Sequence, residues 1–518
     1  MLSATEVLSE KLHMLSHIDV ENDNSDDAQS PVTRRRNSQQ FAISHLFSIV
    51  VRFLKFLIPS FISTRFNRNT TISEKPLAIH SATAWLDGLR GWAAYIVFLH
   101  HTTYLFVDIN WGWGSNGEYY DWHRLPFAHL LLSGHSAVSI FFVVSGFALS
   151  IKPLKQMRNG RIQADLLTTL SSGALRRPIR LYGPIVATTF SIFILSRLGA
   201  FDATRSFLWG MNTRFDDGHL YIQAPGFFEG LYHYVKSTVN FFLAEIYHWS
   251  DDQARYPYDT HLWTLPIEFR SSYTLFATQL AVARLRTATR IPIMLGLVIL
   301  AVYQDYWAIM LFWGGMLLCE LQMMFLARKQ GGVIIGEEAT KPQRQWLSTY
   351  QSAGLHLLNT VTALYLLSMP DEGADSSPFY SALIRWSPPY MRMRWRFWVA
   401  IGAFQLVAGA AFATPALGRF SLAAIFSSPI SRYMGNISYA LYIGHGMANH
   451  LIGVPLFYYV FQFTGQETPL GWALGMTLCI ALQTVVVVWV GDVLWRLVDK
   501  PSVIAARRFE EWCLLKAS

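Results

Sequence analysis

Long apolar segments constrain this chain more than any other feature of its sequence. The plainest of them runs from Trp472 to Val490 without one charged residue. A helix needs about 20 mostly apolar residues to cross the hydrocarbon core of a bilayer. The sequence therefore predicts an all-α polytopic membrane protein, a bundle of about 10 transmembrane helices, near residues 91–107, 127–151, 181–199, 260–282, 291–304, 305–326, 350–369, 397–416, 437–460 and 470–497.

Two of these segments are short. Residues 291–304 and 305–326 together provide only 36 residues, too few for two full spans of about 20 residues each and a turn. We expect one of them to be re-entrant or markedly short.

The composition agrees with a membrane protein. Hydrophobic residues make up 52% of the chain and charged residues only 15%, whereas soluble proteins carry about 25% charged residues. This excludes an ordinary soluble enzyme, a disordered protein and a nucleic-acid-binding domain, so we expect no nucleic-acid partner. The net charge of +8 is the excess of Lys and Arg expected in cytoplasmic loops.

The distribution of charge along the loops predicts the topology. The loop after the first span contains Asp108, Glu118 and Asp121 against Arg124, which is typical of a lumenal or external loop. The next loop is strongly basic and therefore cytoplasmic. Alternation then places 200–259 in the lumen and both termini in the cytoplasm, and the loop that disagrees holds four arginines, Arg385, Arg392, Arg394 and Arg396.

The ends of the chain differ from its apolar middle. Residues 1–75 are predicted to be a disordered or amphipathic cytoplasmic region, with an amphipathic helix lying on the membrane at 41–62; a first spanning helix is the alternative. Residues 76–505 form the membrane domain, and 506–518 a short cytoplasmic tail. Three scattered cysteines, Cys319, Cys479 and Cys513, offer neither a disulfide framework nor a Cys-rich metal site.

Arg90 and His101 are candidates for chemistry because ionisable residues within a span are costly. Eleven residues separate them, which on an α-helix places both side chains on one face, about 16 Å apart along the axis. By the same geometry His100 lies about 80° from Arg90 around the helix axis, and we expect its side chain to pack or to form a hydrogen bond. A histidine that only satisfies the core is the alternative interpretation of His101.

Arg176, Arg177 and Arg180 form a second candidate site, in the cytoplasmic loop directly before the third span. Guanidinium groups suit bidentate binding of phosphate, so a phosphorylated cytosolic ligand could bind there. The alternative is that these charges set topology and contact lipid headgroups.

A third candidate site lies at the lumenal start of the fourth span. His261 and Glu268 are seven residues apart and hence nearly on one helix face, with Arg270 nearby. The pair could bind an acceptor or could only pin the helix. Elsewhere we expect the small residues of Ser145-Gly146-Phe147 to permit close helix packing. We also interpret the segment that contains His445 as a packing segment.

Together these residues resemble the acyltransferase 3 family of integral membrane O-acyltransferases, and its filamentous fungal members in particular. The similarity extends from about residue 85 to 503. Its pieces are Leu86-Asp87-Gly88-Leu89-Arg90-Gly91, the Arg90-x10-His101 spacing, Phe141-Phe142-Val143-Val144-Ser145-Gly146-Phe147, Arg177-x-x-Arg180, Trp263-Thr264-Leu265-Pro266-Ile267-Glu268, Gly435-Asn436-Ile437-Ser438-Tyr439 and Val498-Asp499-Lys500-Pro501.

The resemblance implies transfer of an acyl group, usually acetyl from acetyl-CoA, to a hydroxyl. It implies that His101 is the catalytic histidine, Arg90 its companion, and Arg177 and Arg180 the motif associated with the acyl donor. Many bacterial members have an Asp before the Phe-Phe pair, where this chain has Ser139-Ile140. A role for that carboxylate cannot be carried over.

We accordingly predict a membrane-bound O-acyltransferase that uses acyl-CoA as co-substrate, binds no cofactor or metal, and acts on a small hydrophobic acceptor such as a fungal secondary metabolite. A neutral imidazole can accept the hydroxyl proton, with an acyl-histidine intermediate as the alternative. The competing functions are a proton-coupled transporter and a membrane scaffold. We expect an endoplasmic reticulum or other endomembrane location.

The predicted site residues fall into three groups. The catalytic residues are His101, Arg90 and Glu268, the residues that bind the acyl donor are Arg176, Arg177 and Arg180, and those that bind the acceptor are His261 and Trp263.

Overall fold

The computed structural model describes residues 48, 55–62, 83–160, 165–210, 226–247, 256–329, 349–413 and 415–514. The chain divides into two units, 1–70 and 71–518. In the first, 55–57 and 60–62 are helical, and most of the expected disordered and amphipathic region lies outside the described residues. All that follows concerns the second unit.

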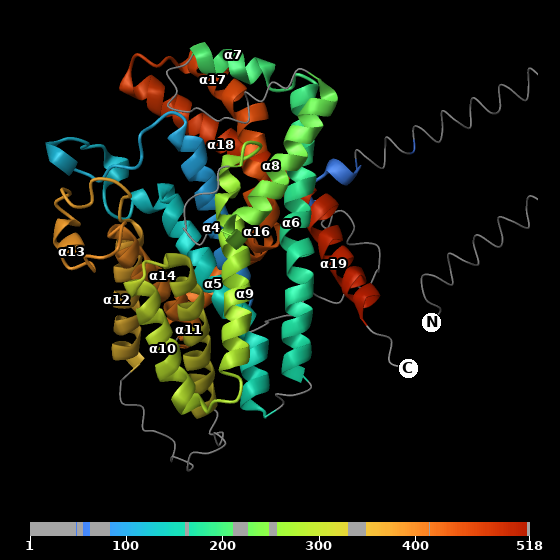
Figure 1. Ribbon diagram of the computed structural model, residues 1–518. Coiled ribbons are helices and arrows are strands. Elements are labelled where there is room, and N and C mark those ends of the chain that lie inside the picture. The colour runs from blue at the N-terminus through green and yellow to red at the C-terminus, as the bar shows by residue number, and fades with distance from the viewer. Residues whose placement is uncertain are drawn as a thin grey trace, which may run out of the picture. The chain divides into compact units, whose positions relative to one another are not determined.

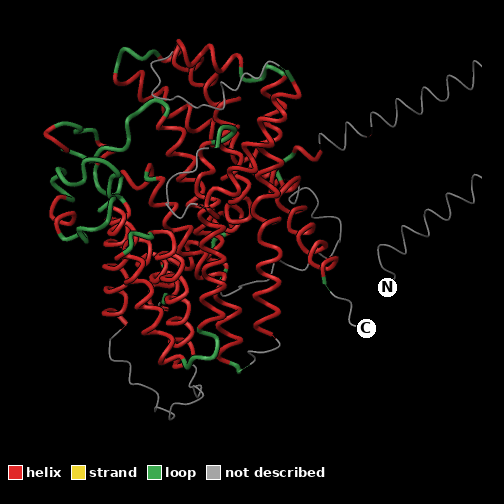
Figure 2. The backbone as a smooth tube through the Cα atoms, in the orientation of Figure 1, coloured by secondary structure: helices red, strands yellow, loops and turns green. Residues whose placement is uncertain are grey.

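The described part of the second unit is helical and contains no strand (Figure 2). Its longer helices, labelled in Figure 1, are α4 (Ala84–Tyr104), α5 (Gly134–Arg158), α6 (Leu167–Arg197), α8 (Phe227–Tyr247), α9 (Thr264–Ala281), α10 (Thr287–Tyr303), α11 (Trp307–Lys329), α12 (Thr349–Leu367), α14 (Trp395–Ala411), α16 (Pro429–Ala448), α18 (Pro469–Leu494) and α19 (Lys500–Cys513). The shorter ones are α7 (Asp202–Gly210), α13 (Ser381–Arg385), α15 (Leu422–Phe426) and α17 (Val454–Thr464).

Four described helical segments are long and apolar enough to cross a membrane: Gly134–Arg158, Leu167–Arg197, Trp307–Arg328 and Pro469–Cys513. The helices α10 and α14 are apolar but shorter. Helices therefore occur at all ten predicted segments, while the count of about ten spans and the cytoplasmic termini stay predictions. In the doubtful pair, α10 is the short member, with 17 residues against 23 in α11.

Several helix starts follow from local sequence. The hydroxyls of Ser428 and Thr468 accept hydrogen bonds from backbone N–H groups at 3.3 and 3.1 Å, at the starts of α16 and α18. Each is followed by a proline in the first helical turn, where proline is favoured because its missing N–H is not needed.

Two expectations about boundaries were wrong. Helix α6 begins at Leu167, so Arg176, Arg177 and Arg180 lie inside it and not in a preceding loop; Pro178 and Pro184 are accommodated within the helix. The region 200–259, expected to be a loop between two spans, contains α7 and α8, and α8 packs against α6 and α9; its lumenal location stays a prediction. The predicted tail from residue 506 is helical as far as Cys513.

Glycines set the closest helix contacts. A Cβ at Gly146 on α5 would lie 2.2 Å from the Phe312 carbonyl oxygen, and one at Gly315 on α11 would lie 2.2 Å from that of Val143. The packing expected at Ser145-Gly146-Phe147 is thus confirmed. The same holds where α4 crosses α16: a Cβ at Gly435 would be 2.5 Å from the Asp87 carbonyl oxygen. Small residues allow such backbone approach.

A buried ion network ties α11 to the end of α5 and the start of α10. Glu320 is fully buried and accepts hydrogen bonds from Arg290 at 2.7 Å and Arg158 at 3.1 Å. Because each charge has an opposite partner, the burial is compensated.

At the other end of the bundle, two loops pack together over the helices. Trp111 and Glu372 form a bridge, and the Arg124 guanidinium donates to the Trp111 carbonyl at 3.1 Å. The ring nitrogens of buried His129 lie 2.8 and 3.0 Å from the carbonyl oxygens of Ile109 and Ser368. His129 therefore links both loops.

Candidate active site

Three histidines from distant parts of the chain meet in one cluster, which we call the histidine cluster: His101, His261 and His445. The ring centroids are 4.0 Å apart for His101 and His261, 5.3 Å for His101 and His445, and 5.0 Å for His261 and His445. His261 and His445 are buried, and His101 is partly buried. The cluster therefore places three imidazoles close together, two of them buried.

Each histidine lies close to the end of a helix. His101 is in the last turn of α4, not in the middle of a span as the sequence predicted, because the helix ends at Tyr104. His261 lies in a 3₁₀ turn, Thr260–Trp263, immediately before α9, and His445 is in the last turn of α16. Helix ends are places where side chains of several elements can converge.

Asp259 orients His261. Its Oδ1 lies 2.9 Å from His261 Nδ1 and accepts the backbone N–H of His261 at 3.0 Å. Asp259 is 1% exposed. A carboxylate at Nδ1 fixes the tautomer and directs the other ring nitrogen outward, so Nε2 is the nitrogen that His261 can offer to the cluster.

His445 is oriented in the same way by backbone. Its Nδ1 donates to the carbonyl of Tyr442 at 2.7 Å, which leaves Nε2 as the acceptor nitrogen. This Nε2 is buried and has no hydrogen-bond partner among the described residues. The hydroxyl of Tyr442 in turn donates to the His261 carbonyl at 2.8 Å, so α16 holds the turn that carries His261.

A glycine permits this approach. A Cβ at Gly446 would lie 2.8 Å from His261 Nδ1 and 3.0 Å from Asp259 Oδ2. The helix can therefore present His445 to the cluster only because the next residue has no side chain.

His100, next to the cluster, has a separate structural partner. Its Nδ1 donates to the Leu132 carbonyl at 2.6 Å, and the side chain is buried. The structure thus gives His100 the hydrogen bond that the helical geometry led us to expect.

Arg90 lies away from His101, near the start of α4. Its guanidinium pairs with Asp87, and eleven helical residues correspond to about 16 Å between Arg90 and His101. The charges of Arg90, Arg176 and Arg177 all act on Arg180. Arg90 therefore belongs to the same basic group as Arg176, Arg177 and Arg180 of α6, and we call these four residues the arginine cluster.

Glu268 joins the arginine cluster as well. Arg177 donates to Glu268 Oε1 at 2.8 Å, and Arg176 pairs with Glu510 of α19 at 3.2 Å. The structure therefore separates the predicted pair His261 and Glu268: the first lies in the histidine cluster, and the second pairs with Arg177 of the arginine cluster.

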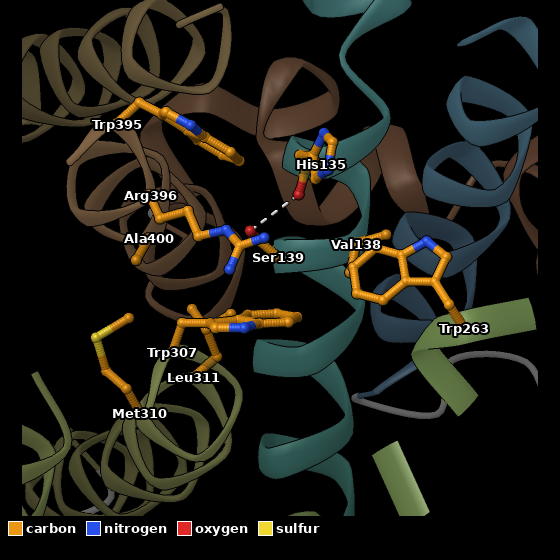
Figure 3. Close-up of a pocket in the computed structure, with 10 residues that line it drawn as sticks. All are labelled: His135, Val138, Ser139, Trp263, Trp307, Met310, Leu311, Trp395, Arg396 and Ala400. Atoms are coloured by element: carbon orange, nitrogen blue, oxygen red, sulfur yellow. Dashed lines mark hydrogen bonds between the residues drawn. The ribbon is translucent and has the colours of Figure 1, made fainter. Parts of the chain in front are cut away.

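Trp263 lines a pocket beside the histidine cluster (Figure 3). The pocket lies where α5, α11 and α14 begin and also includes His135, Trp307, Trp395 and Arg396. Trp263 is two residues from His261, and its ring centroid is 6.3 Å from that of His135.

No local pattern in the sequence connects Asp259 or His445 with His101. The available signals were local: Asp259 lies two residues before His261, and glycines flank His445. The ligand nitrogens of the three histidines lie within 4.8 Å of one another. These side chains could accordingly hold a cation, although the sequence predicted no metal.

Comparisons with known proteins agree on one family. The family model described as an acyltransferase domain (acyltransferase 3) matches residues 83–488. The O-acetyltransferase PaAT-1 of Phomopsis amygdali is 29% identical over 439 residues, covering 82% of this chain and 84% of that protein. The acyltransferase clz18 of Cochliobolus lunatus is 25% identical (83% and 95% covered), and the acyltransferase R4 of a Phoma species 23% identical (82% and 94% covered). No solved structure matches.

Proposed function

This chain belongs to the acyltransferase 3 family and is an acyltransferase, and we propose that it moves an acetyl group from acetyl-CoA to a hydroxyl of a small hydrophobic acceptor. The observation that carries the proposal is the histidine cluster, in which His101 lies 4.0 Å from the ring of His261, itself held by Asp259. The name of PaAT-1, an O-acetyltransferase, supports acetyl as the group transferred.

In this mechanism His101 is the general base. The acceptor hydroxyl attacks the thioester carbonyl, a C–O bond forms and the C–S bond breaks. The hydroxyl proton passes to the imidazole of His101, and the leaving thiolate takes up a proton to give free CoA. A neutral imidazole suits this role, and the neighbouring rings exclude water that would otherwise hydrolyse the thioester.

The arginine cluster is the proposed donor site. CoA carries several phosphates, and guanidinium groups bind phosphate through paired N–H donors. Arg90 and His101 are about 16 Å apart on α4, a separation that the extended pantetheine arm of CoA would bridge. In this mechanism Glu268 positions Arg177 and does not itself act on the reacting atoms.

Acyl transfer from radiolabelled acetyl-CoA to a fungal metabolite and lipid extract tests the proposal. Membranes would contain the wild type, His101→Ala or, as a control, His356→Ala on α12. Loss of a general base costs about 100- to 10,000-fold, so the label should disappear only with His101→Ala. Label that survives this change at equal protein level would refute the role of His101.

Two further measurements distinguish between alternative mechanisms. Ping-pong kinetics would indicate an acyl-histidine intermediate, and sequential kinetics direct attack. Dialysis against a chelator should leave activity unchanged if His101 is a base; loss of activity that zinc restores would instead make the cluster a metal centre.

A further inference from the structure

The histidine cluster comes close to the geometry of a three-histidine cation site. One nitrogen each of His101, His261 and His445 lies within 4.8 Å of the other two. Zinc binds imidazole nitrogens at about 2.0–2.1 Å in tetrahedral geometry, which places the ligand nitrogens about 3.4 Å apart. Ring rotations that move each nitrogen by less than about 1 Å would close this difference.

The outer nitrogens of two of these histidines are held as they are in metal sites. His261 Nδ1 donates to Asp259 Oδ1 at 2.9 Å, and His445 Nδ1 donates to the carbonyl oxygen of Tyr442 at 2.7 Å. A histidine that binds a metal almost always donates its other N–H to a carboxylate or a backbone carbonyl, which fixes the ring and the tautomer. Both rings are therefore set to present Nε2 as a ligand.

One of these nitrogens points independently to a ligand. His445 is 0% exposed, and its Nε2 has no hydrogen-bond partner among the described residues. Because Nδ1 carries the proton, Nε2 has a free lone pair, and a buried acceptor that meets no donor is costly. A cation in the cluster would occupy this lone pair. Asp259, itself 1% exposed, would supply a buried negative charge two bonded groups away.

The ligand chemistry selects the metal. Imidazole nitrogens suit zinc and its transition-metal neighbours, whereas magnesium and calcium prefer oxygen ligands. His101 is only partly buried, so an ion can reach the cluster from that side and a water molecule can complete the tetrahedron. Three histidines and one open position make a complete zinc site.

Resting on the proposed acyl transfer, in which His101 is the general base, we propose that the histidine cluster binds one zinc ion per chain and that this zinc reversibly inhibits the enzyme. The lone pair of His101 that would accept the hydroxyl proton is then shared with the metal. The acceptor hydroxyl keeps its proton and does not attack the thioester. Zinc is accordingly an inhibitor of this acyltransferase and not its cofactor.

Equilibrium dialysis of the purified, tag-free full chain in detergent against radiolabelled Zn²⁺ tests the site, after a chelator has been used and removed. We expect one zinc per wild-type chain. His445→Phe keeps a ring in the same space but removes a ligand and should lose this zinc. Asp259→Asn keeps all three ligands and should weaken zinc binding about 10- to 100-fold. Co²⁺ in place of zinc should give the visible spectrum of a tetrahedral site.

Two control variants exclude binding elsewhere. Cys513 is an exposed thiol that can bind zinc itself, and His356 lies on α12, which carries no member of the cluster. Cys513→Ser and His356→Ala should both bind zinc as the wild type does. Zinc that His445→Phe retains in full would be an adventitious ion only and would overturn the proposal. If His445→Phe fails to fold, an unchanged affinity in Asp259→Asn would overturn it equally.

Transfer assays separate this proposal from the general one. Zinc should stop label transfer by the wild type, and a chelator should restore it. In Asp259→Asn, the half-inhibiting zinc concentration should rise by the same factor as the dissociation constant, with each rate taken relative to the zinc-free variant. Wild type that binds zinc through His445 but is not inhibited, or that loses activity to a chelator and regains it with zinc, would overturn the inhibition. A wild type that transfers no label would refute the proposed function, whereas His445-dependent zinc binding would still support the site.

Discussion

Replacing Gly435 by alanine tests whether the crossing of α4 and α16 sets the geometry of the histidine cluster. The new Cβ would lie 2.5 Å from the Asp87 carbonyl oxygen, whereas ordinary van der Waals contact begins at 3.4 Å. The shortfall, 3.4 Å less 2.5 Å, is 0.9 Å. Because the obstacle is helix backbone, which cannot swing aside as a side chain does, the two helices must move apart by about this distance.

The displacement acts on catalysis because α4 carries His101 and α16 carries His445. A misplacement of about 1 Å in an active site can lower the rate about 100-fold, and overpacking costs about 1–3 kcal/mol of stability. We expect kcat for acetyl transfer to fall about 100-fold, with a modest drop in the thermal midpoint in detergent. Gly296→Ala is the control, since a Cβ there meets no atom within 4 Å.

A Gly435→Ala protein with the kcat of the wild type would refute this reasoning. It would show that the imidazoles keep their relative positions when the helices part, or that their spacing does not limit the reaction. A fall in kcat that Gly296→Ala reproduces would point to a general effect of the added methyl group on the membrane domain.

Three further changes test separate parts of the structure. Arg177→Ala should raise the KM for acetyl-CoA about tenfold and leave the half-saturating acceptor concentration unchanged, whereas Arg197→Ala, at the other end of α6, should change neither. Glu320→Leu leaves the buried Arg290 without its counter-charge and should destabilise the fold by about 3–5 kcal/mol, measured as a lower thermal midpoint; an unchanged midpoint would contradict the ion network. His129→Gln tests the link between the two loops: burial lowers the pKa of His129 below its usual 6.5, so the unfolded chain takes up this proton more readily. The stability of the wild type should fall as the pH drops below 6.5, and this dependence should be weaker in the variant in thermal melts across pH.

The positions of the helices follow from the sequence because hydrophobicity has to be sustained for a whole span. The helix boundaries are harder to predict from the sequence. Helix α6 continues through Arg176, Arg177 and Arg180, because the backbone hydrogen bonds of a helix do not depend on the hydropathy that ends a predicted span. Helix α8 was not predicted, because Glu229 and Lys236 make its segment resemble a polar loop.

The candidate site could be predicted only in part for a similar reason. The spacing of Arg90 and His101 is local and can be worked out from helix geometry. The meeting of His101, Asp259 and His445 depends on how α4, α9 and α16 pack, and no local periodicity encodes it. The separation of Glu268 from His261 is likewise tertiary, since Arg177 of a neighbouring helix attracts the carboxylate.

The helix α19 has a consequence for where this domain can be cut. The family model ends at residue 488, within α18, which continues to Leu494, while α19 packs against α6 and supplies Glu510 to Arg176. A truncation or chimaera joined at residue 488 would divide a helix and remove an acidic partner of the arginine cluster. Fusion partners and affinity tags should therefore follow the last turn of α19, because the smallest unit that keeps the arginine cluster intact extends beyond the residues that the family model matches.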